Sequence, residues 1–489
     1  MKIVTTAQDH PKNIAIKEGE KTWTYQDLLD GSEKFASCLL ESSDHLDGAR
    51  VAFMVDPGFD YVKVQWSIWR SGGIAVPLCL THPLPSLQYV LEDTDASIIV
   101  VSPPYLQLLK EYASEKNIRL ISTEESSTAR SLPMINTADP ALILYTSGTT
   151  NKPKGVVLTH ANLEAQMDNL IDAWKWNADD HTLCVLPLHH VHGIVNVIGC
   201  SMLSGATCEF IPSFSAEKIF ALFLDNHINV FMAVPTIYYK LIAYWETLPE
   251  AKQEMIHTTL KKFRLMVCGS AALPVSTMEK WERISGHLLL ERYGMTEIGM
   301  AISNPYDGER RAGYVGIPLP NVEVRLVDEQ YQDIPAGEQG EILVKGNNVF
   351  KEYWRKPEQT KKEFTSDGWF KTGDVAIKEN DYYRIVGRSS VDIIKSGGYK
   401  ISALEIEEVL RNHEWIKDCA VAGIPDDEWG ELVVAAVEVR AGFDASIINQ
   451  WIRERMPAYK TPKKYMVLET LPRNAMGKVV KNDVKKLFI

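Results

Sequence analysis

The chain has 489 residues, 45% of them hydrophobic, and a formal net charge of −12. At roughly 100 to 200 residues per domain, this length predicts two to four domains with a sizeable core, which excludes disordered and fibrous classes. A net negative charge repels nucleic-acid phosphates and anionic lipids. We therefore expect a small-molecule partner, with no nucleic acid and no membrane.

The N-terminal sequence MKIVTTAQDHPKNIAIKEGEK has neither the apolar stretch of a secretory signal nor the Arg- and Ser-rich pattern of a transit peptide. The apolar runs of the sequence are far shorter than the ~20 residues that a membrane helix needs. These features predict a cytoplasmic protein. The seven cysteines are scattered and never form a CxxC pair, which favours core thiols over a disulfide framework or a zinc cluster.

Between residues 51 and 235, apolar runs such as VAFMV, SIIVV and INVFMAVP alternate with helix-like stretches. This alternation is typical of parallel sheets covered by helices. One helix can be placed by its residues. Thr159 is a suitable N-cap, and the apolar positions that follow recur on one helical face. These positions are Leu163, Met167, Leu170 and Ile171.

From about Tyr314 the sequence changes to short strands separated by Gly and Asn/Asp turns, a pattern typical of a meander or a barrel. After Arg388, Ser402 and Glu405 have the spacing of a capping box that opens an amphipathic helix. We therefore predict a large α/β N-terminal domain, residues 1–388, with two parallel-type sheets covered by helices and a small β-barrel-like part. A small α+β C-terminal domain, residues 389–489, follows it.

The segment YTSGTTNKPKG, residues 145–155, combines hydroxyls, glycines and cations, which are the groups that bind a polyphosphate. Its glycines are too far apart for a Walker A loop, and a valine follows where that loop has lysine. A polar solvated loop is the alternative interpretation. The candidate phosphate ligands are Thr146, Ser147, Gly148, Thr149, Thr150 and Lys154.

Five further segments follow in order: ERYGMTE, WFKTGDV, YRIVGR, SGGYK and PRNAMGK. Together with YTSGTTNKPKG they resemble the adenylate-forming family of acyl-CoA synthetases, luciferases and adenylation domains of peptide synthetases. The resemblance covers nearly the whole chain. Within this family, LPLHHVHG and SNPYDGERRAGYVG resemble the corresponding segments of malonyl-CoA synthetases.

The resemblance implies a two-step reaction that uses ATP, magnesium and CoA. A carboxylate first attacks the α-phosphate of ATP to give an acyl-adenylate and pyrophosphate, and the CoA thiol then displaces AMP. Such chemistry depends mainly on positioning and on cations near the developing negative charge. The family also implies that the C-terminal domain is mobile, because one site must admit a catalytic lysine first and CoA afterwards.

The resemblance implies a role for each motif residue. Lys478 is the catalytic lysine, Thr296 a phosphate ligand and Glu297 the magnesium ligand. Asp374 accepts from the ribose hydroxyls, and Tyr293 stacks on the adenine. The other residues implied for ATP are Gly269, Ser270 and Ala271 beside the adenine, Glu291, Gly294 and Met295 in ERYGMTE, and Arg388 at the domain joint.

Each of three main assignments has a structural alternative. Lys478 could be one more lysine of a solvated C-terminal basic patch. Glu297 could be an exposed carboxylate at a helix start, and Asp374 could be a turn residue before a strand.

The acyl pocket is expected between residues 186–194, 234–238 and 269–292. A buried Arg292 without a partner would be costly, so we expect the substrate to supply a second carboxylate. This points to a short dicarboxylate, malonate or methylmalonate. The alternative is a structural pair between Arg292 and an acid such as Glu291. The other candidates for substrate binding are His190, His192, Val234 and Ser270.

His190 and His192 lie two residues apart, so an extended segment would place both on one side. A metal site built on HHVH is disfavoured because no Cys or Asp lies nearby. For CoA, the resemblance implies the SGGYK segment. Its candidate residues are Ser396, Gly397, Gly398 and Tyr399, and Ser390 stands where the family commonly has Asp or Lys as the pivot of the domain rotation.

The leading hypothesis is therefore a ligase that joins a short dicarboxylate to CoA. The alternatives are a CoA ligase for another small carboxylate, an adenylation enzyme that loads a carrier-protein thiol, and a nucleotide-binding sensor without chemistry. The sensor is disfavoured because Lys478, Thr296, Glu297 and Asp374 are all present. A hydrolase is disfavoured because the sequence has no G-x-S-x-G motif. The sequence does not indicate the oligomeric state.

Overall fold

The computed structural model describes residues 1–146, 153–211, 213–225, 227–389, 391–396, 399–426, 428–440, 442–474 and 477–489. Among these residues no helix is both long and apolar enough to cross a membrane. All seven cysteines are free and, apart from the half-buried Cys38, buried, which confirms the prediction of core thiols.

The first mixed sheet contains nine described strands in the order β15-β14-β13-β12-β11-β9-β10-β1-β2. Its central strands run parallel, and antiparallel strands flank them at both edges. The bounds are β1 (Ile14–Glu18), β2 (Lys21–Thr24), β9 (His181–Cys184), β10 (Thr207–Phe210), β11 (Val230–Ala233), β12 (Leu265–Cys268), β13 (Leu290–Met295), β14 (Gly299–Ser303) and β15 (Ile317–Pro318).

The second sheet has the order β18-β8-β7-β4-β3-β5-β6, parallel from β7 to β6. Its bounds are β3 (Arg50–Met54), β4 (Ile74–Pro77), β5 (Ile98–Val101), β6 (Arg119–Ser122), β7 (Pro140–Thr146), β8 (Lys154–Thr159) and β18 (Glu352–Tyr353). The parallel strands confirm the fold predicted from the alternating apolar runs.

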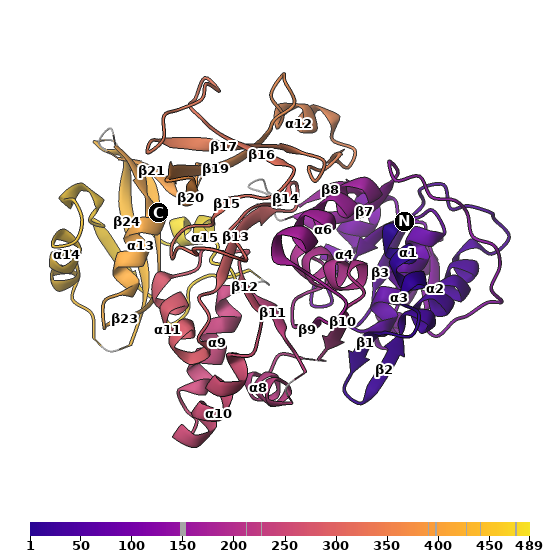
Figure 1. Ribbon diagram of the computed structural model, residues 1–489. Coiled ribbons are helices and arrows are strands. Elements are labelled where there is room, and N and C mark those ends of the chain that lie inside the picture. Colours follow the sequence, from indigo (N-terminus) through magenta and orange to yellow (C-terminus); the bar gives the residue numbers. More distant parts are fainter. Residues whose placement is uncertain are drawn as a thin grey trace.

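Helices lie between the two sheets and on both outer faces (Figure 1). The inner layer holds α1 (Lys2–Asp9), α2 (Tyr25–Leu40), α3 (Phe59–Arg70), α6 (His160–Trp174), the π-helix η2 (His192–Gly199) and α7 (Cys200–Leu203). The outer helices of the first sheet are α8 (Ala216–Leu224), α9 (Pro235–Trp245), α10 (Glu250–Leu260) and α11 (Val275–Ser285). Those of the second are α4 (Leu84–Thr94), η1 (Pro103–Tyr105) and α5 (Leu106–Glu115).

The side chains of the buried strands point alternately to the two faces of a sheet, which explains why helices cover both faces. In β12, Leu265 and Val267 pack into the core between the sheets, whereas Met266 and Cys268 pack under α8 to α11. Successive side chains of a strand point to opposite faces, so a strand with helices on both sides is apolar throughout.

The β-barrel-like part is an antiparallel sheet in the order β16-β17-β19-β20, above the first sheet in Figure 1. The bounds are β16 (Val322–Val327), β17 (Gln339–Gly346), β19 (Phe370–Glu379) and β20 (Tyr382–Arg388), with α12 (Pro357–Lys362) between β18 and β19. Asn380 and Asp381 join β19 to β20, and both have positive φ, as a type I′ hairpin turn requires.

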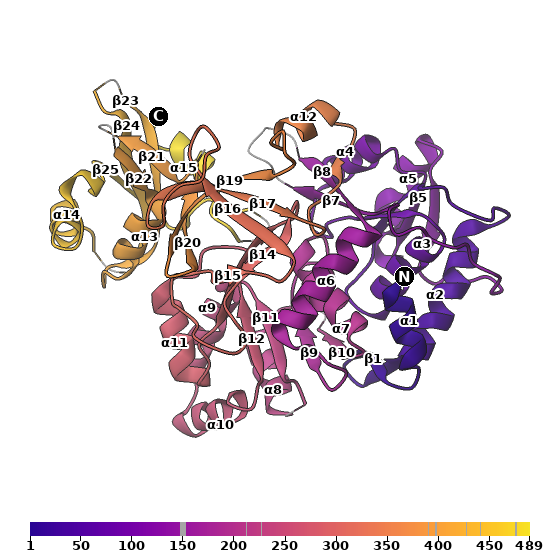
Figure 2. The same cartoon turned by 45° about the horizontal axis from the view of Figure 1, so that its top comes forward.

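The C-terminal part is a separate small α+β unit (Figures 1 and 2). Its sheet has the order β22-β21-β24-β23, and β25 pairs with β24. The bounds are β21 (Ile393–Ser396), β22 (Tyr399–Ser402), α13 (Ala403–Arg411), β23 (Ile416–Asp426), β24 (Gly430–Val439), α14 (Ala445–Arg453), η3 (Ala458–Lys460), β25 (Lys464–Val467) and α15 (Lys481–Lys486).

The two N-caps predicted from the sequence differ in outcome. Thr159 forms a full capping box on α6 with Asn162. Ser402 caps α13 by accepting from the backbone N–H of Glu405, but the reciprocal half of the predicted box is replaced. The carboxylate of Glu405 instead pairs with Lys460, 2.6 Å away, because an ammonium is a stronger partner than a backbone amide.

Candidate active site

The described ends of the phosphate segment lie on the antiparallel strands β7 and β8, where Thr146 pairs with Lys154. The Nζ of Lys154 lies 4.7 Å from the ring centroid of Tyr353. The hydroxyl of Tyr353 donates to Oε1 of Glu297 over 2.9 Å. Lys154 in β8 and the predicted magnesium ligand are therefore neighbours. The predicted ligands Ser147, Gly148, Thr149 and Thr150 lie outside the described residues.

Glu297 lies in the turn between β13 and β14, next to the partly exposed Thr296, and its exposed fraction is 5%. The alternative of an exposed carboxylate at a helix start is therefore wrong. Burial raises the pKa of Glu297, while the Tyr353 hydroxyl and the charge of Lys154 lower it. The preceding Gly294 has no room for a side chain, because a Cβ there would meet the carbonyl oxygen of Gly299 at 2.0 Å. Met295 ends β13.

Asp374 joins Tyr293 and Arg388. The Tyr293 hydroxyl donates to its Oδ2 over 2.6 Å, and Nε of Arg388 donates to its Oδ1 over 2.9 Å. Asp374 is buried within β19, directly opposite Arg388 in β20, so the alternative of a turn residue is wrong. An ionised carboxylate offers about four acceptor positions, so both oxygens can still accept from hydroxyl groups.

Arg292 is 3% exposed and has no acidic partner within ion-pair distance among the described residues. Its Nη2 donates to Oγ of Ser270 over 3.2 Å, and its buried Nε has no described partner. The guanidinium lies against Gly269, where a Cβ would meet Nη1 at 2.5 Å. Burial lowers the pKa of Arg292 to about 10, so the group stays charged at neutral pH.

Glu291 does not pair with Arg292, because neighbouring residues of a strand point to opposite faces. Its Oε1 accepts from the backbone N–H of Leu273 over 3.3 Å, and its buried Oε2 has no partner among the described residues. Burial raises the pKa of Glu291 to about 8. Glu291 thus contacts the loop before α11, and its contact with ATP stays a prediction.

His190 and His192 do not lie in an extended segment, so that expectation is wrong. His190 lies in a bend, and His192 begins the π-helix η2, a conformation that is frequent at functional sites. Nδ1 of His192 is 3.1 Å from Oγ of Ser270. Burial lowers the pKa of His190 to about 3 and that of His192 well below its usual value. Both Nε2 atoms are buried without a described partner.

Ser270 therefore links the histidine and the arginine, and it does so from a left-handed conformation with φ of 70°. Such a conformation costs energy in a residue other than glycine and is concentrated at functional sites. Ala271 follows it and is exposed, and Val234 is half-buried between β11 and α9.

Lys478 reaches this cluster from the C-terminal part. Burial, together with the charges of Arg292 and Arg388, lowers the pKa of Lys478 to about 8. A Cβ on the adjacent Gly477 would lie 3.6 Å from Cγ2 of Thr236 in α9. The alternative of a solvated basic patch is therefore wrong.

Two family models match the chain, "AMP-binding enzyme" over residues 3–354 and "AMP-binding enzyme C-terminal domain" over residues 405–478. The chain belongs to the AMP-binding enzyme family. Similar proteins include the mitochondrial malonate–CoA ligase ACSF3 of Bos taurus, 43% identical over 97% of this chain and 88% of that protein.

Solved structures of this family are also similar to the chain. The ATP-bound MatB from Rhodopseudomonas palustris has a TM-score of 0.92 and 32% identity, covering 100% of this chain and 98% of that one. A malonyl-CoA ligase in a ternary product complex with methylmalonyl-CoA and AMP has a TM-score of 0.69 and 34% identity, covering 94% of this chain and 97% of that one.

The residues of this AMP-binding enzyme fit ATP with magnesium. Glu297 offers hard carboxylate oxygens beside strand β8, and Asp374 keeps free acceptor positions beside the ring of Tyr293. For CoA, Ser396 is buried, and Tyr399 is 53% exposed and stacked on Tyr459 at 4.2 Å between ring centroids. Gly397, Gly398 and Ser390 lie outside the described residues.

Sequence reasoning missed Tyr353, which donates a hydrogen bond to Glu297, and Glu408, which accepts one from Val275 at the start of α11. Neither lies in a recognisable motif, and each acts on a residue more than 50 positions away in the chain.

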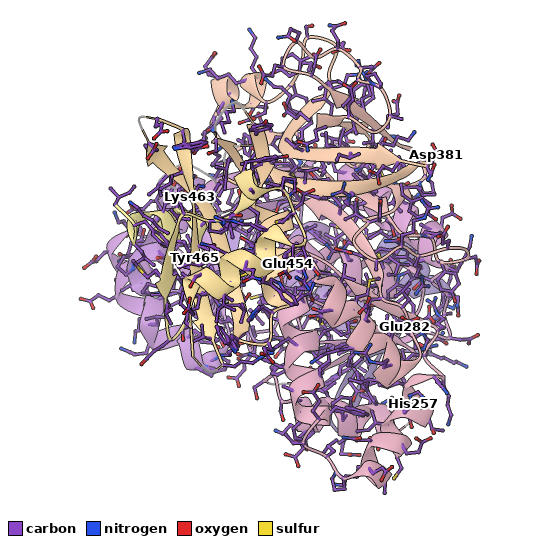
Figure 3. The ribbon with its side chains drawn as sticks, turned by 90° about the vertical axis from the view of Figure 1, so that its left-hand side faces the viewer. His257, Glu282, Asp381, Glu454, Lys463 and Tyr465 are labelled. Carbon is purple, nitrogen blue, oxygen red and sulfur yellow. The ribbon has the colours of Figure 1, made fainter. Side chains whose placement is uncertain are left out.

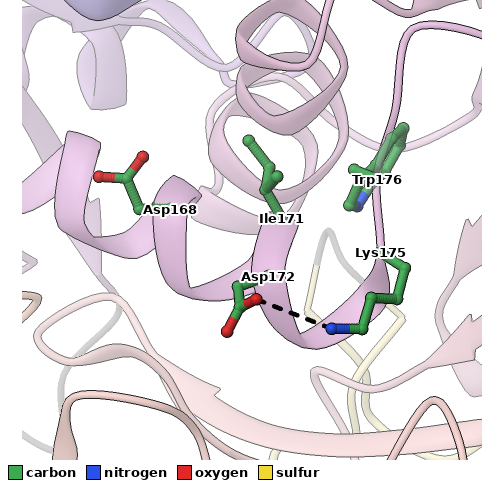
Figure 4. Close-up of a pocket in the computed structure, with 5 residues that line it drawn as sticks. All are labelled: Asp168, Ile171, Asp172, Lys175 and Trp176. Atoms are coloured by element: carbon green, nitrogen blue, oxygen red, sulfur yellow. Dashed lines mark ion pairs between the residues drawn. The ribbon is translucent and has the colours of Figure 1, made fainter.

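Two polar features outside this cluster have structural explanations. A surface hollow at the end of α6, shown in Figure 4, contains an exposed ion pair between Asp172 and Lys175. On the first sheet, Oε2 of Glu209 lies 2.9 Å from Nε2 of both His181 and His227. Lys17 lies 3.2 Å from the other oxygen of Glu209, so the ammonium balances the buried carboxylate without a metal ion.

Proposed function

We propose that this AMP-binding enzyme is an ATP-dependent malonate–CoA ligase, which forms malonyl-AMP with release of pyrophosphate and then malonyl-CoA with release of AMP. The observation that carries the proposal is a buried, charged Arg292 that has no acidic partner among the described residues. A buried guanidinium of this kind is stabilised by an anionic ligand. The relatives named malonate–CoA ligase support the same substrate.

Malonate carries two carboxylates close together, and the site has two cations close together. One carboxylate would pair with Arg292, while the other lies near Lys478 and attacks the α-phosphate. The two cations are near enough for the charge of Arg292 to lower the pKa of Lys478. A monocarboxylate would leave Arg292 unpaired.

The hydrogen bonds around Ser270 support a role for His192 in binding the substrate. Nη2 of Arg292 donates to Oγ of Ser270, so the hydroxyl hydrogen of Ser270 points to Nδ1 of His192. This assignment places the proton of the neutral imidazole on Nε2. Nε2 of His192 then donates to the carboxylate held by Arg292, and Val234 and His190 complete the acyl pocket.

The remaining residues hold ATP. Thr146, Lys154 and Thr296 lie at the phosphate end with Glu297 as the magnesium ligand, and Asp374 holds the ribose. The other proposed ATP contacts, grouped by motif, are Ser147, Gly148, Thr149 and Thr150 in the phosphate segment, Gly269, Ser270 and Ala271 beside the adenine, Gly294 and Met295 before Thr296, and Tyr293 and Arg388 at the nucleoside. Magnesium supplies charge neutralisation on the phosphates.

Lys478 stabilises the charge that develops in the first step. We assign CoA to the segment from Ser396 to Tyr399. We place the boundary between the two domains at Arg388, with residues 1–388 and 389–489 on its two sides.

A pyrophosphate-release assay with CoA across a panel of carboxylates tests the proposal. We expect malonate to be favoured over acetate and butyrate by a large factor, with methylmalonate as the second dicarboxylate in the panel. A preference for acetate or a long chain overturns it. AMP release that requires an added carrier protein instead of CoA indicates an enzyme that loads a carrier.

The cytoplasmic location predicted from the sequence also belongs to this proposal. The Bos taurus relative is named as mitochondrial, so cell fractionation against a mitochondrial marker is the relevant test.

A further inference from the structure

The start of helix α11 is capped by the C-terminal domain. The N-cap residue of α11 is Pro274, which has no side-chain acceptor and makes no side-chain cap. The backbone N–H of Val275 donates instead to Oε1 of Glu408, in α13, over 3.2 Å. Figures 1 and 2 show α11 and α13 side by side. The cap therefore comes from a residue 133 positions away, in the other domain.

A carboxylate is well suited to this position. The first N–H groups of a helix have no partner within the helix, and the helix dipole is positive at this end. Burial raises the pKa of Glu408, Arg411 and the Val275 amide lower it, and Glu279 and Glu407 raise it.

The loop that leads into α11, residues 269–274, also belongs to the candidate active site. Leu273, two residues before Val275, donates to Glu291, and Ser270 of the same segment holds Arg292. Glu291 and Glu408 thus bind the segment on the two sides of Pro274. The position of the C-terminal domain is thereby linked to the loop that carries the acyl-site serine.

The contact lies away from the joint between the domains. Near the joint, Asp392 accepts from the backbone N–H of Arg388 and pairs with Lys481 at 2.6 Å. Asp392 and Arg388 are four residues apart in the chain, so that contact can persist when the domain turns. The contact between Glu408 and Val275 joins two bodies and is lost when α13 leaves α11.

We propose that Glu408 is a positioning residue for adenylate formation. It caps α11 only in the domain arrangement that brings Lys478 to Arg292, and so it stabilises that arrangement relative to the one that admits CoA. The inference rests on the proposed function, because it assumes that the two half-reactions need two arrangements. Glu408 itself contacts no reacting group.

The first test is Glu408→Ala, with the two half-reactions measured separately. We expect adenylate formation, measured as malonate-dependent pyrophosphate exchange, to fall by on the order of tenfold, the worth of one charged cap. Thioester formation from supplied malonyl-adenylate and CoA should stay within about twofold. The matched control is Glu414→Ala, an exposed glutamate just after α13, which should change neither.

The second test gives α11 a cap of its own through Pro274→Asp. An aspartate N-cap stabilises the isolated helix, so a purely structural role of Glu408 predicts unchanged activity and an equal or higher Tm. A positioning role predicts slower adenylate formation, because the new carboxylate competes with Glu408 and repels it. Thioester formation again stays unchanged.

Equal loss in both half-reactions of Glu408→Ala, or unaltered adenylate formation in either variant, overturns the inference. The proposed function survives those results, since the wild type would still turn over malonate. A wild type that releases no pyrophosphate with any dicarboxylate overturns the proposed function instead.

Discussion

The guanidinium of Arg292 donates to the hydroxyl of Ser270 over 3.2 Å, and this is its one hydrogen bond among the described residues. A guanidinium has five N–H donors, so a buried arginine with a single described bond can still take an anionic ligand through its remaining donors. This relationship separates Arg292 from the structural arginines of the chain. Arg264, for example, pairs with Asp180 through two nitrogens.

Replacing Arg292 by leucine should change the carboxylate preference. We expect the kcat/KM for malonate to fall by tens-fold or more, since truncating one partner of a buried charge pair costs on the order of 2 to 5 kcal/mol. Activity with acetate or butyrate should be kept or improved, because no unpaired charge is left behind. The control Arg283→Leu removes an exposed arginine from α11. If all substrates lose activity equally, Arg292 is a structural residue or a phosphate ligand.

The lowered pKa of Lys478 predicts a characteristic pH dependence of adenylate formation. Burial and the charges of Arg292 and Arg388 lower its pKa to about 8, whereas Asp374 raises it. The ammonium is therefore present below about pH 8 and is lost as the pH rises through that value. We expect kcat/KM for adenylate formation to fall above about pH 8. Lys478→Arg should move this decline to higher pH, because a guanidinium stays protonated.

Lys478→Ala should abolish adenylate formation and leave thioester formation from supplied acyl-adenylate largely intact, since the charge that it stabilises develops in the first step. Comparable losses in both half-reactions contradict the role given to Lys478.

Asp374→Asn should raise the KM for ATP. The substitution removes the charge that pairs with Arg388 and weakens the hydrogen bond from Tyr293. The ribose then loses a hydrogen-bond acceptor, and the side chains of Tyr293 and Arg388 lose the carboxylate that orients them. The KM for malonate should change little. The control Asp381→Asn removes an exposed carboxylate at the tip of the β19–β20 hairpin, labelled in Figure 3. An unaltered ATP dependence removes Asp374 from the site.

Glu291→Gln should raise the stability of the protein at alkaline pH. The pKa of Glu291 in the fold, about 8, lies above its usual value of 4.5. Its contribution to stability is therefore complete below about pH 4.5 and is lost as the pH rises through 8. Glutamine keeps an acceptor for Leu273 and carries no charge. We expect a gain of roughly 1 to 3 kcal/mol at pH 8.5 and little at pH 5.

Thermal unfolding at the two pH values measures the effect of Glu291→Gln. The control Glu282→Gln, on the outer side of α11 in Figure 3, should shift Tm equally little at both. A gain at pH 5 that equals the gain at pH 8.5 contradicts the buried charge as its cause.

The sequence by itself determined the features that depend on neighbouring residues. The N-cap at Thr159, the apolar face of α6 and the turn at Asn380 and Asp381 follow from local hydrogen bonding, helical periodicity and backbone preference. The order of the motifs likewise indicated the family. Each of these signals is contained in a short stretch of chain.

Only the tertiary structure decided which charges have partners. The sequence left open whether Arg292 pairs with Glu291, and it placed His190 and His192 in an extended segment. It also contained no sign that Tyr353 holds Glu297 or that Glu408 caps α11. These properties depend on which remote side chains come within a few ångströms and on how much water they exclude. Desolvation and charge pairing are set by that distance, and spacing along the chain does not determine it.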